Sequence, residues 1–370
     1  MIRTFRLRAP TLLLAVVVVA LAIAALGCGN GGGERYDVAL VQSPKDEAAD
    51  LTSADVTDLV SQAVSRAGGL DFIKDGQTVV LKPNLVTFYQ DDGENTASDT
   101  VNGISTDWRV TKAVAALVRA KNPGGKILVM EGSTILTSDV YPVLGYTAAN
   151  FGATVDDFLG LEAVSTSCAD GSTSGLEQRT AHSGKAYWFN SRYVSADVII
   201  AIGTLATDAW AGIGGAIESM AIGGTPAEQY GSGDNAIDCT RTKIDRSSPE
   251  ALGDFIRDYY GVRPADFVVI DGLQGLEHGP LPVWDDSGTY DYGASIENMR
   301  VVLAGKNAVA VDTVAALVMK CDPTKVPHLT KLRSDGLGTT DSSAITVVGQ
   351  SVTDVTKAFT GKQTGICPGK

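Results

Sequence analysis

The chain has 370 residues, of which 44% are hydrophobic and 20% charged, so it has the composition of a globular protein rather than a disordered one. This length allows one large domain or two closely packed domains. The formal net charge is −13, and no Lys/Arg-rich run follows the N-terminal segment. Nucleic acid is therefore excluded as an expected partner, because a phosphate backbone requires a basic surface.

The N-terminus has the pattern of a secretory signal peptide. Arg3, Arg6 and Arg8 precede an unbroken apolar run over 11–26, and small residues follow it up to Cys28. The alternative is an uncleaved membrane anchor, for which the apolar run of 16 residues is short.

Ala-Leu-Gly-Cys at the end of this segment resembles the bacterial lipobox, with Ala25 where Leu is usual. We therefore expect residues 1–27 to be a lipoprotein signal peptide and Cys28 to carry the lipid. The Gly-rich residues 28–35 then form a flexible tether. This predicts an exported lipoprotein that the lipid holds to the membrane, on the periplasmic or cell-surface side.

The remaining chain alternates short apolar runs with amphipathic stretches. The apolar runs are nearly continuous, which is typical of parallel strands covered on both faces, so the predicted fold class is α/β. Three polar, Gly-containing stretches read as loop insertions, at 87–105, 160–185 and 223–246. The domain is expected over 36–350, with a C-terminal tail at 351–370. Predicted strands lie at 36–42, 77–82, 126–130, 197–202, 267–270, 299–304 and 344–348, with a hairpin element at 186–193; predicted helices lie at 52–67, 107–121, 138–152, 248–260, 307–320 and 326–333.

Polar side chains follow several of the predicted strands. If the strands are parallel, their carboxyl ends share one edge of the sheet, which is where ligands bind in such folds. We therefore expect a cleft at this edge. The polar residues at the strand ends are Lys82, Asn84, Glu131, Thr204, Asp208 and Asp271.

Two further acidic residues stand out near the C-terminal end of the domain. Glu277, next to His278, lies in the loop expected after the turn at Asp271-Gly272, and Asp312 lies on a very apolar helix. A carboxylate buried on such a helix must be paired or coordinated. An oxygen-rich set would suit a hard cation such as Mg²⁺ or Ca²⁺. The predicted metal ligands are Asp208, Asp271, Glu277 and Asp312.

Familiar catalytic motifs are missing from the sequence. The segment from Gly212 to Ile217 matches G-x-G-x-x-G only in part, and it starts ten residues after the preceding strand, so tight helix packing is the better interpretation. There is no P-loop and no G-x-S-x-G elbow. The three histidines have no metal-ligand spacing; we expect His182 to be exposed and His328 to be structural.

An exported chain can form disulfides, and four cysteines follow the lipidation site. They allow three pairings, of which we favour Cys168–Cys239 together with Cys321–Cys367. No CxxC is present, so the chain encodes neither a zinc ribbon nor an iron–sulfur motif.

Taken together, these segments resemble the DUF362 family over roughly residues 36–350. The family is of unknown function, and some members carry fused ferredoxin-type iron–sulfur modules. The resemblance implies an α/β fold and a redox setting, without naming a reaction. It is carried by VVLKPNLV, STDWRVTKAVAALV, VSADVIIAIGTLATD, YGVRPADFVVIDGLQGLEHGP, VVLAGKNAVAVDTVAALVMKCDPTKVPHL and GLG…ITVVG.

The sequence departs from the family pattern at two places. Relatives usually have Lys-Thr-His after the strand at 197–202 and Lys-Asn in the following Gly-rich helix. Here these positions read Ala206-Thr207-Asp208 and Glu218-Ser219. A site built for an anion would lose several charge-assisted contacts in this way. Two alternatives follow: the ligand has changed, for example to a cation, or the ancestral chemistry is lost.

Two functions remain open from the sequence. The first is an enzyme in which Lys82 and Asn84 orient an anionic or carbonyl group, while Asp271, Glu277 and Asp312 supply acid/base or metal-ligand oxygens, with His278 close by. The second is a non-catalytic lipoprotein that binds a small molecule or a cation in the same cleft. The sequence names no cofactor beyond the candidate divalent cation.

Overall fold

The protein is described by a computed structural model, which covers residues 35–86, 103–162, 171–231, 239–280, 283–284, 290–291, 295–363 and 365–369. Residues 34–370 form one compact unit. The predicted signal peptide, Cys28 and most of the tether lie outside the described residues, as does Cys168. Within the described ranges, no helix combines the length and the apolar character that crossing a membrane requires.

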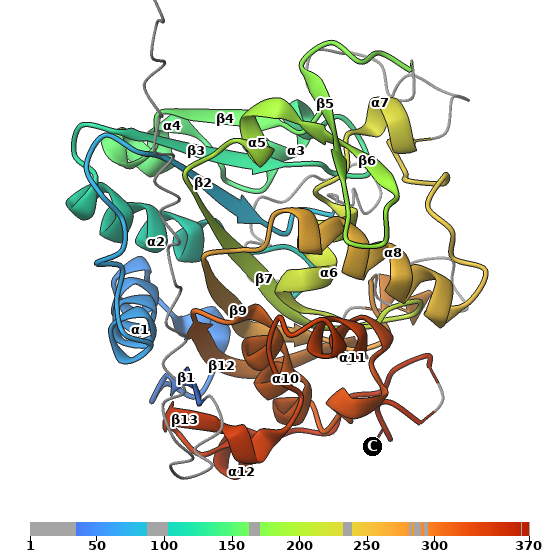
Figure 1. The fold of residues 1–370 in the computed structure, drawn as a ribbon. Helices are drawn as coiled ribbons and strands as arrows, with labels where there is room; N and C mark the ends of the chain where they lie inside the picture. Colours follow the sequence, from blue (N-terminus) through green and yellow to red (C-terminus); the bar gives the residue numbers. More distant parts are fainter. Residues whose placement is uncertain are drawn as a thin grey trace, which may run out of the picture. The chain divides into compact units, whose positions relative to one another are not determined.

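The fold is built on one mixed, mainly parallel sheet, which has nine strands in the part of the chain that the structure describes (Figure 1). Its order is β13-β1-β12-β9-β7-β2-β3-β4, with β8 paired to β7. Strands β9, β7, β2, β3 and β4 run parallel, while β12 is antiparallel to both of its neighbours. The strands are β1 (Tyr36–Gln42), β2 (Thr78–Pro83), β3 (Lys126–Glu131), β4 (Asp157–Gly160), β7 (Val198–Asp208), β8 (Gly212–Gly214), β9 (Phe267–Leu276), β12 (Ile296–Gly305) and β13 (Ile345–Gly349).

Helices cover both faces of this sheet, as the apolar strands predicted. On one face α1 (Ser53–Arg66) and α2 (Trp108–Lys121) pack over one apolar cluster. On the other face α6 (Gly215–Ile222), α8 (Pro249–Val262), α10 (Ala308–Val318) and α11 (Pro327–Ser334) pack over a second cluster (Figure 1). Strands β7 and β9 are buried along almost their whole length, so they form the centre of the fold.

Local sequence signals explain most helix boundaries. The Asp107 carboxylate accepts the N–H of Arg109 at the start of α2, and Ser248 and Asn307 cap α8 and α10 in the same way. Helix α1 is capped by Thr52, which forms a reciprocal capping box with Asp55.

Three predictions of local structure are corrected. The turn expected at Asp271-Gly272 is wrong: β9 continues through an irregularity in its pairing with β7 and ends at Leu276. The helix expected at 138–152 is divided into α3 (Thr137–Val143), α4 (Ala148–Phe151) and a short 3-10 turn, because Pro142 and Gly145 interrupt it. The insertion at 160–185 contains β5 (Leu176–Thr180), which pairs with β6 (Ala186–Asn190) as a hairpin.

The C-terminal tail returns to the end of the sheet that bears the polar residues. A disulfide joins Cys321, just after α10, to Cys367. The N–H of His278 donates to the Thr360 carbonyl at 3.0 Å, and Gln363 Nε2 donates to the Trp210 carbonyl. Cys239 is also disulfide-bonded, and its partner lies outside the described residues.

Removing the tail disulfide should destabilise the whole unit. It closes a loop of 46 residues, so replacing both Cys321 and Cys367 with Ser should lower the free energy of unfolding by about 2–4 kcal/mol. Urea unfolding followed by circular dichroism measures this. A loss below about 0.5 kcal/mol would show that the tail is held by its other contacts alone.

Candidate functional site

A cavity of about 570 Å³ lies at the carboxyl ends of β2, β3, β7 and β9, where the sequence predicted a cleft. Helix α6 and the segment 240–246 close it from the other side. The walls are mainly apolar, with a few polar groups, which is the usual make-up of a small-molecule site. Strand-end residues in the wall include Asn84, Glu131, Thr204 and Asp208.

A buried ion pair supports the floor of this cavity: Glu131 lines the cavity and Lys82 lies behind it. Lys82 Nζ lies 2.8 Å from Glu131 Oε2 and 3.1 Å from Ser219 Oγ, and it also donates to the Pro83 carbonyl. Both charged residues are 1% exposed. Burial lowers the pKa of Lys82 and raises that of Glu131, and the pairing of their charges opposes both shifts. The pair ties β2, β3 and α6 together.

Two glycines let α6 approach its anchors closely. A Cβ at Gly223 would lie 2.6 Å from Glu131 Oε1 and 2.7 Å from Lys82 Nζ. A Cβ at Gly215, which has a positive φ of 72°, would lie 2.7 Å from Asp312 Oδ1. Gly215 belongs to the segment predicted to serve tight helix packing, and together with Gly223 it places α6 against both carboxylates.

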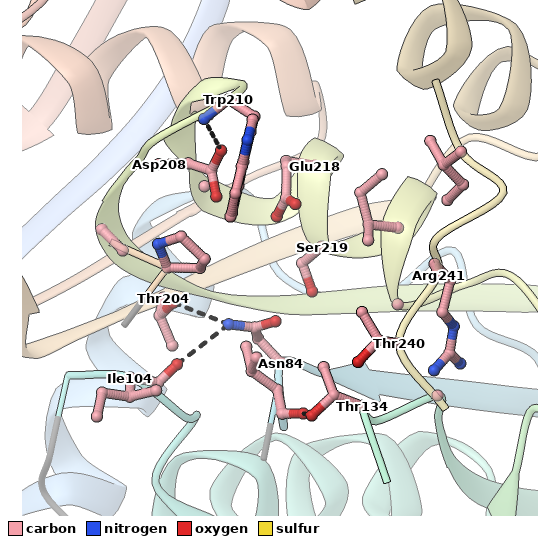
Figure 2. Close-up of a pocket in the computed structure, with 18 of the residues that line it drawn as sticks. Asn84, Ile104, Thr134, Thr204, Asp208, Trp210, Glu218, Ser219, Thr240 and Arg241 are labelled. Atoms are coloured by element: carbon pink, nitrogen blue, oxygen red, sulfur yellow. Dashed lines mark hydrogen bonds between the residues drawn. The ribbon is translucent and has the colours of Figure 1, made fainter. Parts of the chain in front are cut away.

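Two carboxyl groups and an amide face the cavity (Figure 2). Asp208 Oδ1 accepts the N–H groups of Trp210 and Ala211 at 2.8 and 2.6 Å. Asn84 Nδ2 donates to the Ile104 carbonyl and to Thr204 Oγ1 at 3.2 and 3.1 Å. Figure 2 shows Glu218 extending into the same space from α6.

The surroundings of Glu218 favour the protonated form of its carboxyl group. This group has no hydrogen-bond partner among the described residues. Burial, together with the neighbouring Asp208, raises the pKa of Glu218 to about 8. Burial also raises the pKa of Asp208, although its two backbone N–H bonds oppose that shift. The two acids therefore form a pair that does not ionise fully near pH 7.

The opening of the cavity carries an aromatic ring and a guanidinium. Trp210 is 46% exposed and lines the cavity. The Arg246 guanidinium lies over its ring, 5.9 Å from the centroid. Arg241, a second lining arginine, is buried and donates to backbone carbonyls of Ser133, Cys239 and Thr225.

The predicted catalytic set does not assemble around this cavity. Asn84 lies in the wall, but Lys82 lies behind it in the ion pair. Asp271 faces the opposite side of the sheet, where its carboxylate accepts the N–H groups of Asp107 and Leu273 at 2.8 and 3.0 Å. Glu277 and His278 belong to the β9 end beside the tail, with His278 Nε2 4.0 Å from Glu277 Oε2, and neither lines the cavity.

The predicted cation site is wrong as a single cluster. Asp312 is fully buried, and its two oxygens accept the N–H groups of Ala216 and Ile217 at 3.0 Å each, at the start of α6. Asp312 and Asp271 thus serve helices on opposite faces of the sheet, and only Asp208 of the four reaches the cavity. Within the described residues, no three His, Cys, Asp or Glu side chains gather closely enough to hold a metal ion.

The sequence analysis did not identify several residues that line the cavity. Glu218 was noted only as a departure from the family pattern, although an acidic residue in an otherwise apolar helix is itself a signal. Trp210, Arg241 and Arg246 lie in loop segments with no periodicity, so the sequence offered no guide to where they point. The remaining histidines match their predictions, with His182 exposed and His328 buried away from the cavity.

The structure is thus an α/β protein with a cavity at the carboxyl edge of its sheet. The family model described as a domain of unknown function, DUF362, matches residues 79–317, more than half of the chain. The chain therefore belongs to the DUF362 family. No curated protein matches it.

One solved structure similar to the chain is the lactate racemase apoprotein from Thermoanaerobacterium thermosaccharolyticum. The identity is 12% and the TM-score is 0.38, over 81% of this chain. The match spans 57% of that protein. A likeness of this degree carries no argument about activity.

Loss of the Glu131 charge should be costly. Glu131→Gln leaves the Lys82 ammonium buried without its counter-charge, so we expect a loss of about 3–5 kcal/mol in the free energy of unfolding. Asp71→Asn is the matched control, because it removes an ion pair with Lys121 at the surface, where solvent screening leaves little stability to lose. Similar small losses in both variants would contradict the role given to the buried pair.

Asp312 should make stability depend on pH. Burial raises its pKa to about 7, so the folded state holds a proton that the unfolded chain releases near pH 4. The contribution of this group to stability is fully present below pH 4 and is lost as the pH rises to 7. The free energy of unfolding of Asp312→Asn should therefore fall less steeply between pH 4 and 7. The difference in slope should correspond to at most about one bound proton. An unchanged slope in urea titrations at several pH values would refute this.

Proposed function

We propose that this DUF362 member is an exported, lipid-anchored protein that binds a small organic molecule in the cavity at the carboxyl edge of its sheet. The observation that carries the proposal is the cavity itself, about 570 Å³ in volume, with mainly apolar walls and a few polar groups at the ends of adjacent strands. The export and the anchor rest on the N-terminal sequence pattern alone.

A catalytic role by proton transfer is the second candidate. It is supported by Glu218, whose raised pKa of about 8 suits a group that gives or takes a proton near neutral pH. Binding is the stronger candidate because the residues that the sequence predicted for catalysis are used elsewhere. Lys82 is held by Glu131 and Ser219, and Asp271 accepts the N–H of Asp107 at the start of α2 on the other face.

Filling the cavity should abolish binding without unfolding the protein. Ile222 is half-buried in the cavity wall, so Ile222→Trp places an indole in the space for the ligand. The probe is Prodan, a neutral naphthalene dye whose fluorescence rises in apolar surroundings. We expect the purified protein to bind it and Ile222→Trp to bind it at least tenfold more weakly.

The matched control is Leu117→Trp, at a half-buried helical position on the opposite face of the sheet. It should bind the dye as the wild type does. Equal binding by all three proteins would place the dye outside the cavity, and no binding by the wild type would count against the proposed function.

A further inference from the structure

The cationic groups at and behind the cavity floor use most of their hydrogen-bond donors in contacts within the protein. The Lys82 ammonium donates to Glu131, to Ser219 Oγ and to the Pro83 carbonyl, which accounts for its three protons. Arg241 makes four hydrogen bonds, to Thr225 Oγ1 and to three backbone carbonyls. A ligand that needs donors from this floor would have to break contacts that hold the fold together.

The acceptors, by contrast, are open. Because Asn84 Nδ2 donates to a carbonyl oxygen, which can only accept, the amide orientation is fixed, and its Oδ1 has no partner among the described residues. Asp208 receives both backbone N–H groups on Oδ1, so Oδ2 remains unused. The Glu218 carboxyl accepts no hydrogen bond from any described residue. These three groups come from β2, β7 and α6, and all line the cavity.

We propose that the cavity takes a small organic cation, an ammonium or guanidinium group on an apolar body; this rests on the proposed function of the same cavity. The cationic head donates to Glu218, Asp208 and Asn84, whose acceptors it matches. The apolar body lies against the hydrophobic walls, which a hydrated metal ion would not use. The exposed Trp210 ring at the opening adds a cation–π surface for the approaching head group.

The charges around Glu218 set how binding depends on pH. They are Asp208 on β7, Glu131 on β3, Lys82 on β2 and Arg246 in the segment after β8 and α6. Lys82 is neutralised by Glu131, so Asp208, Arg246 and the buried Arg241 remain the other charged groups that line the cavity. A bound cation favours the ionised form of Glu218, so binding should release a proton and become tighter as the pH rises from 6 to 8.

Arg246 is the feature that favours the opposite ligand class. Its Nη1 donates to the carbonyls of Arg241 and Ile244, while its other N–H groups have no described partner. These groups could meet an anion at the opening. If the cavity is a cation site, Arg246 opposes binding, so Arg246→Gln should strengthen it. If the cavity is an anion site, the same substitution should weaken binding.

Three probes with one aromatic body separate these cases: 1-naphthylmethylammonium, 1-naphthylmethanol and 1-naphthoate. Titration calorimetry at pH 8 should show the ammonium binding at least tenfold more tightly than the alcohol, and the naphthoate more weakly than either. The ammonium should bind several-fold more tightly at pH 8 than at pH 6. The amine itself stays mainly ionised at both pH values, because the pKa of an alkylammonium group lies well above 8. Binding of the alcohol alone keeps the proposed function and overturns the cation class; binding of none of the three counts against both.

Glu218→Gln tests the acidic pair directly. This substitution keeps the size of the side chain and removes its charge. The variant should therefore lose the tenfold or greater preference of the wild type for the ammonium over the alcohol. It should also lose most of the pH dependence of ammonium binding. Asp208→Asn, which keeps an acceptor for the Trp210 and Ala211 N–H groups, should reduce the preference in the same direction. Asp37→Asn, an exposed acid on β1, is the control and should bind like the wild type. An ammonium preference unchanged in both cavity variants would overturn the proposal.

Discussion

The buried pair of Lys82 and Glu131 is the constraint on which the site depends. Two charges removed from water stabilise a fold only when each is fully paired. Here Lys82 donates hydrogen bonds to Glu131 and to Ser219 Oγ, and the Glu131 carboxylate also accepts two backbone N–H groups. The pair joins the ends of two parallel strands to a helix on one face of the sheet. It thereby fixes the floor of the cavity, and it leaves the ammonium unable to serve a ligand.

The two departures from the family pattern now have a structural meaning. Asp208 ends strand β7 and Glu218 lies on helix α6, and both face one cavity. The physical reason for the raised pKa of Glu218 is burial beside Asp208. Cationic side chains at these positions would give the same cavity an excess of donors. In this chain the open groups on Asn84, Asp208 and Glu218 are acceptors instead, while the N–H groups of Arg246 that have no described partner lie at the opening. The change fits an altered ligand better than a decayed site, because the cavity and its supporting contacts are intact.

Much of the fold follows from the sequence, because near-continuous apolar strands and clear helix caps each have a local cause. The location of the site follows as well, since parallel strands bring Asn84, Glu131, Thr204 and Asp208 to one edge. What could not be predicted is the direction of individual side chains. Asp271 and Asp312 looked like ligands because a buried carboxylate needs a partner, but backbone N–H groups at helix starts satisfy that need. Alternation along β9 places Asp271 on the face opposite to the cavity.

The central claim is that the cavity is lined by acceptors and holds a proton on Glu218. The most direct measurement is a pH titration of the protein labelled with ¹³C at the glutamate side-chain carboxyl, followed by NMR. The account predicts one resonance that titrates near pH 8, that is missing in Glu218→Gln, and that moves to lower pH when the ammonium probe binds. If the resonance assigned to Glu218 titrates in the ordinary range of a glutamate, the account of this site is contradicted.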